Sequence, residues 1–324
     1  MAAKNTTAVL LMAYGSPNSL SEVEPYLLQV KGGRQSTPEQ VERLKERYRQ
    51  VGGRTPLLQI TQAQAVGLRN RLRLQGFDLP VYFGMKHWNP FIEDIVEDIV
   101  HNGSNFIIGI ALAPHYSQLS IGGYEAAILK GLAKENSKVS VTTVKSWHKQ
   151  EQLINALARR VSNSIESMRA HDDGVVLFTA HSLPKNAVGP DDPYQAQLQE
   201  SSRLVAKIAG VDQWSFAFQS AGEPKEAWLG PQILEEITRL VKEEGFSKIV
   251  VCPIGFVSDH LEILYDLDIE AKQHAKALGA KLERTASLND DPEFIDALAS
   301  ETTSAFKQLL QPLVQSSAVI ALNE

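Results

Sequence analysis

Short apolar runs recur along this chain at nearly regular intervals, and longer segments with amphipathic spacing separate them. Continuous apolar runs are typical of strands that are covered on both faces, whereas half-exposed strands alternate apolar and polar residues. Their alternation with helical segments such as Pro231–Glu244 favours parallel sheets of the doubly wound α/β type. The runs are Ala8–Tyr14, Val81–Met85, Phe106–Pro114, Val139–Trp147, Gly174–Ser182, Trp214–Ser220, Lys248–Phe256 and Ala280–Leu288.

The length of 324 residues and a repeated motif indicate two halves. Single hydrophobic cores stop growing near about 250–300 residues, so a chain of this length is expected to divide. Leu10–Pro17 and Leu177–Pro184 share one order: a strand, an alanine, a ring-bearing residue, a small residue and a proline. We predict two Rossmann-like domains, 1–147 and 148–289, each a four-stranded parallel sheet flanked by helices. A last helix, 292–310, is expected to pack back on the first domain.

Equivalent strands in the two halves end in polar loops. The third run of the first half leads into Ala113–Ser120, and the third run of the second half leads into Cys252–His260. In open α/β sheets, ligands bind at the carboxyl ends of the strands. The sequence therefore predicts one cleft, with a set of loops from each half facing it.

Charge, cysteine content and motif content exclude several classes of protein. A net charge of −6 argues against a nucleic-acid partner. Cys252 is the single cysteine, which excludes an intrachain disulfide framework and an iron–sulfur cluster bound by several thiolates, and favours a reducing cytoplasm. No apolar stretch approaches the roughly 18 residues that a membrane span needs. No glycine-rich phosphate loop and no Gly-x-Ser-x-Gly elbow occurs, so nucleotide binding and the usual hydrolase chemistry have no support.

His181 is the first candidate for chemistry, because it follows a predicted strand and precedes a turn. A neutral imidazole at such a sheet edge could accept a proton or bind a metal, since its ordinary pKa is near about 6.5. The alternative is a loop histidine that caps a helix or fills a gap, and the residues alone leave both interpretations open. His87, His115 and His260 are more simply explained as hydrogen-bonded structural residues, with His260 the least certain because it adjoins an acidic segment.

That acidic segment, Val257–Lys272, is the second candidate. On an α-helix Glu262, Asp266 and Glu270 would lie on one side, about 6 Å apart along the axis. Like charges at this spacing weaken a helix by a few tenths of a kcal/mol per pair, a cost that function or cations would offset. The alternative is a solvated face, but oxygen ligands in a row also suit a hydrated divalent cation such as Mg²⁺. A separate packing stripe would comprise Leu261, Leu264 and Leu267.

Three segments carry a resemblance to a known family. Thr179–Pro184 ("TAHSLP"), Gln219–Pro231 ("QSAGEPKEAWLGP") and Cys252–Glu270 ("CPIGFVSDHLEILYDLDIE") resemble signatures of ferrochelatases, which insert ferrous iron into a porphyrin. The similarity runs from about residue 8 to about residue 305. The loop "MAYGSP", with Tyr14, resembles the soluble bacterial branch that acts on coproporphyrin III. The resemblance implies a two-lobed chelatase with a porphyrin cleft between the lobes, and ferrous iron as a substrate rather than a permanent cofactor.

The resemblance also implies roles for individual residues. His181 and Glu262 would form a catalytic pair on one face of the macrocycle, and Tyr14 would face the metal from the other side. Asp266 and Glu270 would continue from that pair as a metal-delivery or Mg²⁺-binding column. Cleft-lining and propionate-contacting positions would be Lys31, Arg47, Tyr48, Thr55, Tyr124, Ser220 and Trp228. Lys31 stands where relatives often have arginine, which puts a bidentate contact in doubt there.

Other activities stay open at this stage. The chain could act on protoporphyrin IX, or it could be another tetrapyrrole metal chelatase. A non-catalytic tetrapyrrole carrier is a further alternative, although a carrier need not retain His181, Glu262 and the acidic column together. A transient contact with the next enzyme of the haem pathway is also expected from the resemblance.

Overall fold

The computed structural model describes residues 6–222 and 227–321, with side chains up to residue 310. Each of the eight predicted runs contains a strand, and the strands form two four-stranded parallel sheets. The α/β class with two flanked sheets is therefore confirmed. The strands are β1 (Thr7–Ala13), β2 (Val81–Met85), β3 (Phe106–Ala111), β4 (Ser140–Val144), β5 (Gly174–His181), β6 (Trp214–Gln219), β7 (Lys248–Cys252) and β8 (Lys281–Arg284).

The two sheets repeat one topology. Their strand orders are β2-β1-β3-β4 and β6-β5-β7-β8, so β1 corresponds to β5 and β3 corresponds to β7. The residues that opened the two halves in the sequence thus occupy equivalent strands, and so do the two strands that lead into polar loops. All ladders are parallel, which brings the carboxyl ends of each sheet to one edge.

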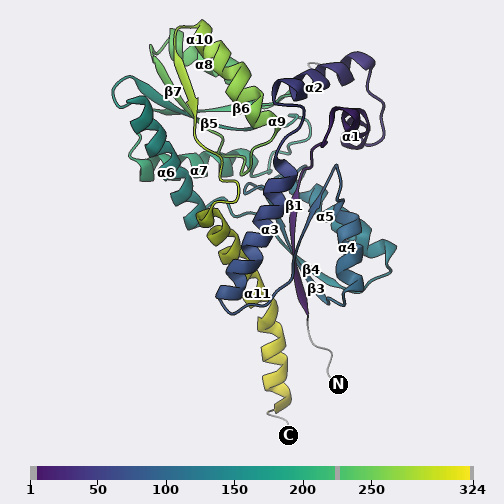
Figure 1. Ribbon diagram of the computed structural model, residues 1–324. Helices are drawn as coiled ribbons and strands as arrows, with labels where there is room; N and C mark the ends of the chain where they lie inside the picture. The colour runs from purple at the N-terminus through teal and green to yellow at the C-terminus, as the bar shows by residue number, and fades with distance from the viewer. Residues whose placement is uncertain (1–5, 223–226, 322–324) are drawn as a thin grey trace.

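Helices cover both faces of each sheet (Figure 1). The α-helices are α1 (Val23–Val30), α2 (Pro38–Gln50), α3 (Leu57–Leu74), α4 (Ile92–His101), α5 (Ile121–Lys134), α6 (Glu151–Met168), α7 (Tyr194–Ala209), α8 (Ile233–Lys242), α9 (Leu261–Leu264), α10 (Lys272–Ala277) and α11 (Pro292–Ala321). A short 3-10 helix, η1, spans Leu20–Glu22, and a π-helix, η2, spans Asp266–Ala271. Among the described residues, no helix is both long and apolar enough to cross a membrane.

One continuous hydrophobic core joins the two sheets. Val9 and Leu11 on β1 belong to the same buried cluster as Val176 and Phe178 on β5. Because successive side chains of a strand point to opposite faces, the alternate residues of β1 pack under α4 and α5, and those of β5 pack under α8 and α10. The apolar runs of the sequence are therefore continuous because both faces of each sheet are covered.

The last helix, α11, contributes to this shared core. Phe294 is fully buried there, and its ring centroid lies 5.9 Å from that of Trp147. The helix packs against α3 of the first half and against α6, which precedes the second sheet. It begins at Pro292 as expected but continues to Ala321, past the predicted end at residue 310. The division into domains 1–147 and 148–289 stays a prediction.

Candidate active site

Tyr14 and His181 follow or end the equivalent strands β1 and β5. Gly15 makes the turn after Tyr14 with a φ of +99°, and an added Cβ there would approach the Trp88 nitrogen to 2.9 Å. On the second sheet, Gly255 lets the loop after β7 pack on the end of β5, because a Cβ at 255 would lie 2.6 Å from that of Ala180. Both glycines permit the close backbone approaches that bring these strand ends to the site.

His181 and Glu262 form an ion pair. The His181 Nε2 lies 3.4 Å from the Glu262 Oε1, and the side chains are 37% and 29% exposed. The other ring nitrogen, Nδ1, donates to the carbonyl oxygen of Ser182, which orients the imidazole. The structure thus brings together the two residues that the resemblance paired, and both keep some access to solvent.

The pair changes the protonation of both partners. Burial lowers the pKa of His181, but the Glu262 charge and the hydrogen bond to it outweigh burial and raise this pKa to about 9. Burial would raise the pKa of Glu262, yet the charges and hydrogen bonds of His181 and His260 hold it well below its usual range. At neutral pH His181 is therefore an imidazolium. The neutral imidazole expected from the ordinary pKa of histidine is not the resting form of this residue.

The acidic segment is not the single α-helix that its spacing suggested. One turn of α-helix, α9, is followed by the π-helix η2, in which the Glu270 amide donates to the Tyr265 carbonyl oxygen at 2.9 Å, five residues back. Through this change of helix type the buried face is kept, because Ile263, Leu267 and Ala271 are four residues apart and all are fully buried. The row continues to Ala275, which is also fully buried, so one apolar face runs through α9, η2 and α10.

The predicted leucine stripe is correspondingly wrong in part. Leu267 is buried, but Leu261 and Leu264 are only half-buried, and Ile263 takes the buried position of the first turn. Asp259 lies before the helix rather than on it. Because π-helical turns inside α-helices are frequent at functional sites, the local geometry agrees with a site at this segment.

Asp266 is the most deeply buried carboxylate of the acidic segment, with 3% exposure. Its Oδ2 accepts from the Ser220 Oγ at 2.5 Å, and its Oδ1 lies 3.5 Å from the Arg47 Nη1 with no hydrogen bond. Burial and the charge of Glu262 raise the pKa of Asp266 to about 6, against the opposing effects of Ser220 and Arg47. Its proton uptake therefore falls close to physiological pH.

Tyr14 follows β1 in the first half and lies within reach of the Glu262 charge. It is 45% exposed, and its ring centroid is 4.5 Å from that of His87. Burial and the Glu262 charge both raise the pKa of Tyr14, so the carboxylate of the second half acts on the phenol of the first.

The predicted propionate contacts fall into two groups. Tyr48 and Thr55 are buried, and their hydroxyl groups each lie 2.8 Å from the Ser16 Oγ. Arg47 instead reaches across to the second half, where it pairs with Asp266 and stacks 4.8 Å above the Tyr265 ring. Figure 1 shows α2, which carries Arg47 and Tyr48, beside α9.

The remaining predicted contacts are more dispersed. Lys31 donates to the Gln40 Oε1 at 2.8 Å, next to the start of α2. Tyr124 is buried on α5, with the Lys86 ammonium 5.4 Å from its ring centroid. Trp228 covers Gly222, where an added Cβ would meet its ring at 2.4 Å. Residues 223–226 of the same signature lie outside the described residues.

Several residues that the sequence analysis set aside also lie at the site. The His260 Nε2 is 3.7 Å from the Glu262 Oε2, whereas His181 is paired with the other carboxylate oxygen, Oε1. Gln219 ends β6 and donates to the Glu262 carbonyl oxygen at 2.8 Å. His87, beside Tyr14, has its pKa lowered to about 4 by burial and by the charge of Lys86. Gln219 ends a strand and His87 follows one, whereas the signal for His260 was its place next to the acidic residues.

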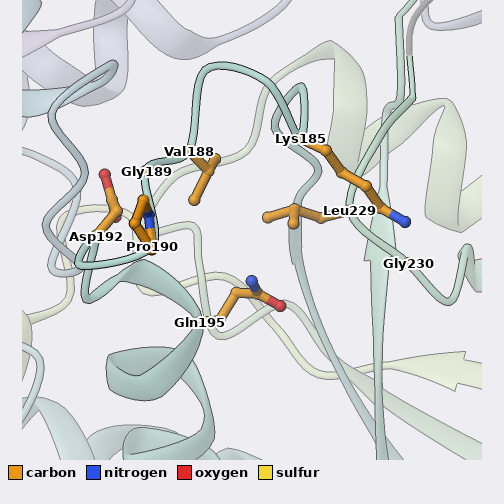
Figure 2. A pocket seen from close by; sticks show the side chains of 8 residues that line it. All are labelled: Lys185, Val188, Gly189, Pro190, Asp192, Gln195, Leu229 and Gly230. Atoms are coloured by element: carbon orange, nitrogen blue, oxygen red, sulfur yellow. The ribbon is translucent and has the colours of Figure 1, made fainter.

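The predicted metal contacts do not form a ready-made metal centre. Within the part of the chain that is described, no three His, Cys, Asp or Glu side chains are arranged to hold one ion together. A cavity of about 480 Å³ lies on the loop after His181, and Figure 2 shows Lys185 turned away from Asp192 across it. Its lining includes Val188, Pro190 and Leu229 but neither His181 nor Glu262.

Chelatases are among the solved structures that share this fold. SirB from Bacillus subtilis with Fe³⁺ superposes with a TM-score of 0.60 at 14% identity, over 93% of this chain and 95% of that one. CbiX, described as the terminal enzyme for siroheme biosynthesis in denitrifying bacteria, gives a TM-score of 0.53 at 11% identity, over 92% and 99%. The two repeated sheets and these superpositions place this chain in the chelatase fold class.

Sequence relatives narrow the class. The model of the ferrochelatase family matches residues 6–305. A ferrochelatase from Herpetosiphon aurantiacus is 46% identical over 92% of this chain and 98% of its own length. A coproporphyrin III ferrochelatase from Geobacillus kaustophilus is 40% identical over 92% and 95%. The chain belongs to the ferrochelatase family and is a metal chelatase.

Proposed function

We propose that this chain inserts ferrous iron into coproporphyrin III in the cytoplasm, giving iron coproporphyrin (coproheme) for haem biosynthesis. The observation that carries the proposal is the His181–Glu262 pair at 3.4 Å, whose carboxylate charge also acts on the exposed Tyr14 of the other half. Relatives named coproporphyrin III ferrochelatase, at 38–40% identity, support the choice of porphyrin. Relatives at 42–46% identity carry only the name ferrochelatase, so the porphyrin is the point to test.

Metal insertion requires that the flat macrocycle be bent, because its nitrogen lone pairs lie in the ring plane. Binding energy from the propionate edge can be spent on that distortion. We assign this edge to Tyr48 and Thr55, whose hydroxyl groups share Ser16, together with Lys31 and Tyr124. Ser220 and Trp228 are assigned to the cleft wall on the other half.

Proton removal falls to the His181–Glu262 pair. The imidazolium must first lose its proton before it can accept one from a pyrrole nitrogen, because its pKa is about 9. An arriving divalent cation opposes the positive charge of His181 and competes for the carboxylate of Glu262, and both effects lower the pKa of His181. Iron entry and release of the imidazolium proton are thereby coupled, which leaves a neutral ring beside the bent porphyrin.

The cation would reach this pair along Asp266 and Glu270. Asp266 holds two partners from different elements, Ser220 and Arg47, and its pKa of about 6 lets it ionise near neutral pH. A propionate that attracts Arg47 would free the Oδ1 of Asp266 for the cation. The same oxygens suit Mg²⁺, which we propose as a further ion for Asp266 and Glu270.

The decisive experiment offers ferrous iron with coproporphyrin III and with protoporphyrin IX in parallel, and follows the metalloporphyrin spectrum under anaerobic conditions. We expect faster turnover of coproporphyrin III, because the propionate contacts supply the energy for bending. Preference for protoporphyrin IX would overturn the choice of substrate but keep the chelatase. Binding of either porphyrin without metal insertion would indicate a carrier.

Replacing His181 with alanine tests the catalytic assignment. The His181→Ala variant should lose at least about 10²-fold in turnover, the usual contribution of a general base, while it still binds coproporphyrin III. Turnover measures the first effect and quenching of porphyrin fluorescence the second. Near-normal turnover would remove His181 from the mechanism.

A further inference from the structure

The five carboxylates between Val257 and Lys272 divide into two sets. Glu262, Asp266 and Glu270 belong to the site described above, but Asp259 and Asp268 do not. Asp268 accepts two hydrogen bonds from Arg284, from Nε at 2.9 Å and from Nη2 at 3.0 Å. Asp259 lies 3.4 Å from the same Nη2 through its Oδ1. One guanidinium therefore binds both acids that the active site leaves unused.

Arg284 is itself held in place. It is the last residue of β8, and its side chain is only 12% exposed. Its Nη1 donates to the Thr285 carbonyl oxygen at 2.9 Å and to the Ser287 Oγ at 3.1 Å. A planar guanidinium with its donors directed in this way offers a fixed geometry, which a lysine ammonium could not reproduce.

The Asp259 end has further support from the same loop. Its two carboxylate oxygens accept from the Ser287 Oγ at 2.6 Å and from the Asn289 Nδ2 at 2.9 Å. The Asp259 amide in turn donates to the Asn289 Oδ1 at 2.9 Å. The loop from Arg284 to Asn289 thus binds Asp259, just before α9. Arg284 also binds Asp268, inside η2.

We propose that Arg284 is a positioning residue for metal insertion. By binding both Asp259 and Asp268, it fixes the main chain between residues 259 and 268. This segment, 259–268, carries Glu262 and Asp266, whose carboxylates must keep a set distance from His181 and from each other. The inference rests on the proposed function. The carboxylates that Arg284 contacts are those that the proposed site leaves unused, so it acts on the reaction through the segment that it holds.

The test compares Arg284→Met with Arg284→Lys. Arg284→Met should lower kcat about tenfold, because small displacements of catalytic groups are costly, and should leave the KM for porphyrin within about twofold. Arg284→Lys should recover only part of kcat, since a lysine cannot form the two parallel bonds to Asp268. Hydrogen exchange of the amides between 262 and 271 should become faster in Arg284→Met.

A double variant checks that the effect runs through Asp268. Asp268→Asn alone should lower kcat less than Arg284→Met does, because an amide still accepts one hydrogen bond. Combining Arg284→Met with Asp268→Asn should cause no further loss, as expected for two residues that act through one contact. Full additivity of the two losses would contradict the proposal.

The matched control is Arg239→Met. Arg239 makes the same two-bond contact in the second half, with Nε and Nη2 on Glu236 at 3.0 and 2.6 Å, but on α8. It should lower the melting temperature without changing kcat or exchange between 262 and 271. If Arg284→Met behaves like this control, Arg284 is merely structural and the proposal is wrong. If the unsubstituted chain inserts no iron, the proposed function fails, and hydrogen exchange still decides whether Arg284 orders this segment.

Discussion

At the scale of single residues, environment gives similar side chains different tasks. Glu262 is ionised because His181 and His260 flank it, whereas Asp266 has a pKa of about 6 because burial and the Glu262 charge oppose its ionisation. Asp268 is half-buried and satisfied by Arg284. The pKa values of Glu262 and Asp266 are thus shifted in opposite directions. Such opposite shifts commonly allow one site to hold both an acid and a base.

The His181–Glu262 pair should make stability depend on pH. The folded-state pKa of His181, about 9, lies above its ordinary value of 6.5, so its contribution is complete below about pH 6.5 and is lost as the pH rises to about 9. Glu262, with a lowered pKa, contributes above its ordinary value of 4.5. Relative to Glu262→Gln, the unsubstituted chain should therefore gain most between about pH 5 and 6.5.

Melting curves across this pH range measure the effect. Because both side chains are about one-third exposed, solvent screens the pair, and we expect a difference of roughly 2–4 °C. Glu262→Gln supplies the comparison at each pH, and His181→Ala should remove the same pH dependence. A difference that stays constant from about pH 6 to 10 would show that the two groups are not coupled.

At the scale of elements, helix geometry follows the buried positions. The four-residue spacing of Ile263, Leu267 and Ala271 accompanies the π-turn that carries Asp266 and Glu270. The last helix, α11, has a different task, because its buried face completes the core between the sheets. Phe294 is the largest fully buried side chain on it and packs beside Trp147.

Replacing Phe294 with alanine tests this role of α11. The free energy of unfolding should fall by about 3–5 kcal/mol, because the substitution removes apolar contacts and leaves a cavity. Phe306→Ala, on the same helix, is the control: Phe306 is only partly buried, against Phe77, and its loss should cost less. Urea denaturation measures both. Equal losses would mean that α11 has no special place in the shared core.

At the scale of the whole molecule, polar contacts join the two halves beside the core. Gln64 on α3 is fully buried and donates to the Ser258 Oγ at 2.9 Å and to the Asn289 carbonyl oxygen at 2.8 Å. His115, after β3, lies 2.9 Å from the Ser201 Oγ on α7. These contacts connect the halves at fixed points, and one of them, at Ser258, lies at the start of the acidic segment.

Gln64→Leu should weaken this junction. The substitution leaves the Ser258 hydroxyl and the Asn289 carbonyl without the donor, which should lower the free energy of unfolding by about 1–3 kcal/mol. Gln62→Leu, two residues away but exposed, should change it by less than about 0.5 kcal/mol. Thermal unfolding followed by circular dichroism measures both. Equal effects would show that the buried amide does not join the halves.

The sequence alone determined much of this protein. Eight strands, two repeated halves and the positions of His181 and Tyr14 at strand ends follow from local patterns, because apolar periodicity and turn residues act over a few neighbours. The three family signatures also predict that His181 and Glu262 act as a pair, and the two side chains are in contact in the structure. What could be predicted is therefore the order of elements and the residues at their ends.

The pairing of charges between distant residues depends on the folded arrangement of the chain. The acidic spacing predicts an α-helix, but the structure has a π-turn at Asp266–Ala271. Arg47 pairs with Asp266, and Arg284 holds Asp268, although nothing near these residues in the chain indicates either contact. Such pairs form only when the two halves and their loops meet, because an ion pair depends on separation in space rather than on separation along the sequence.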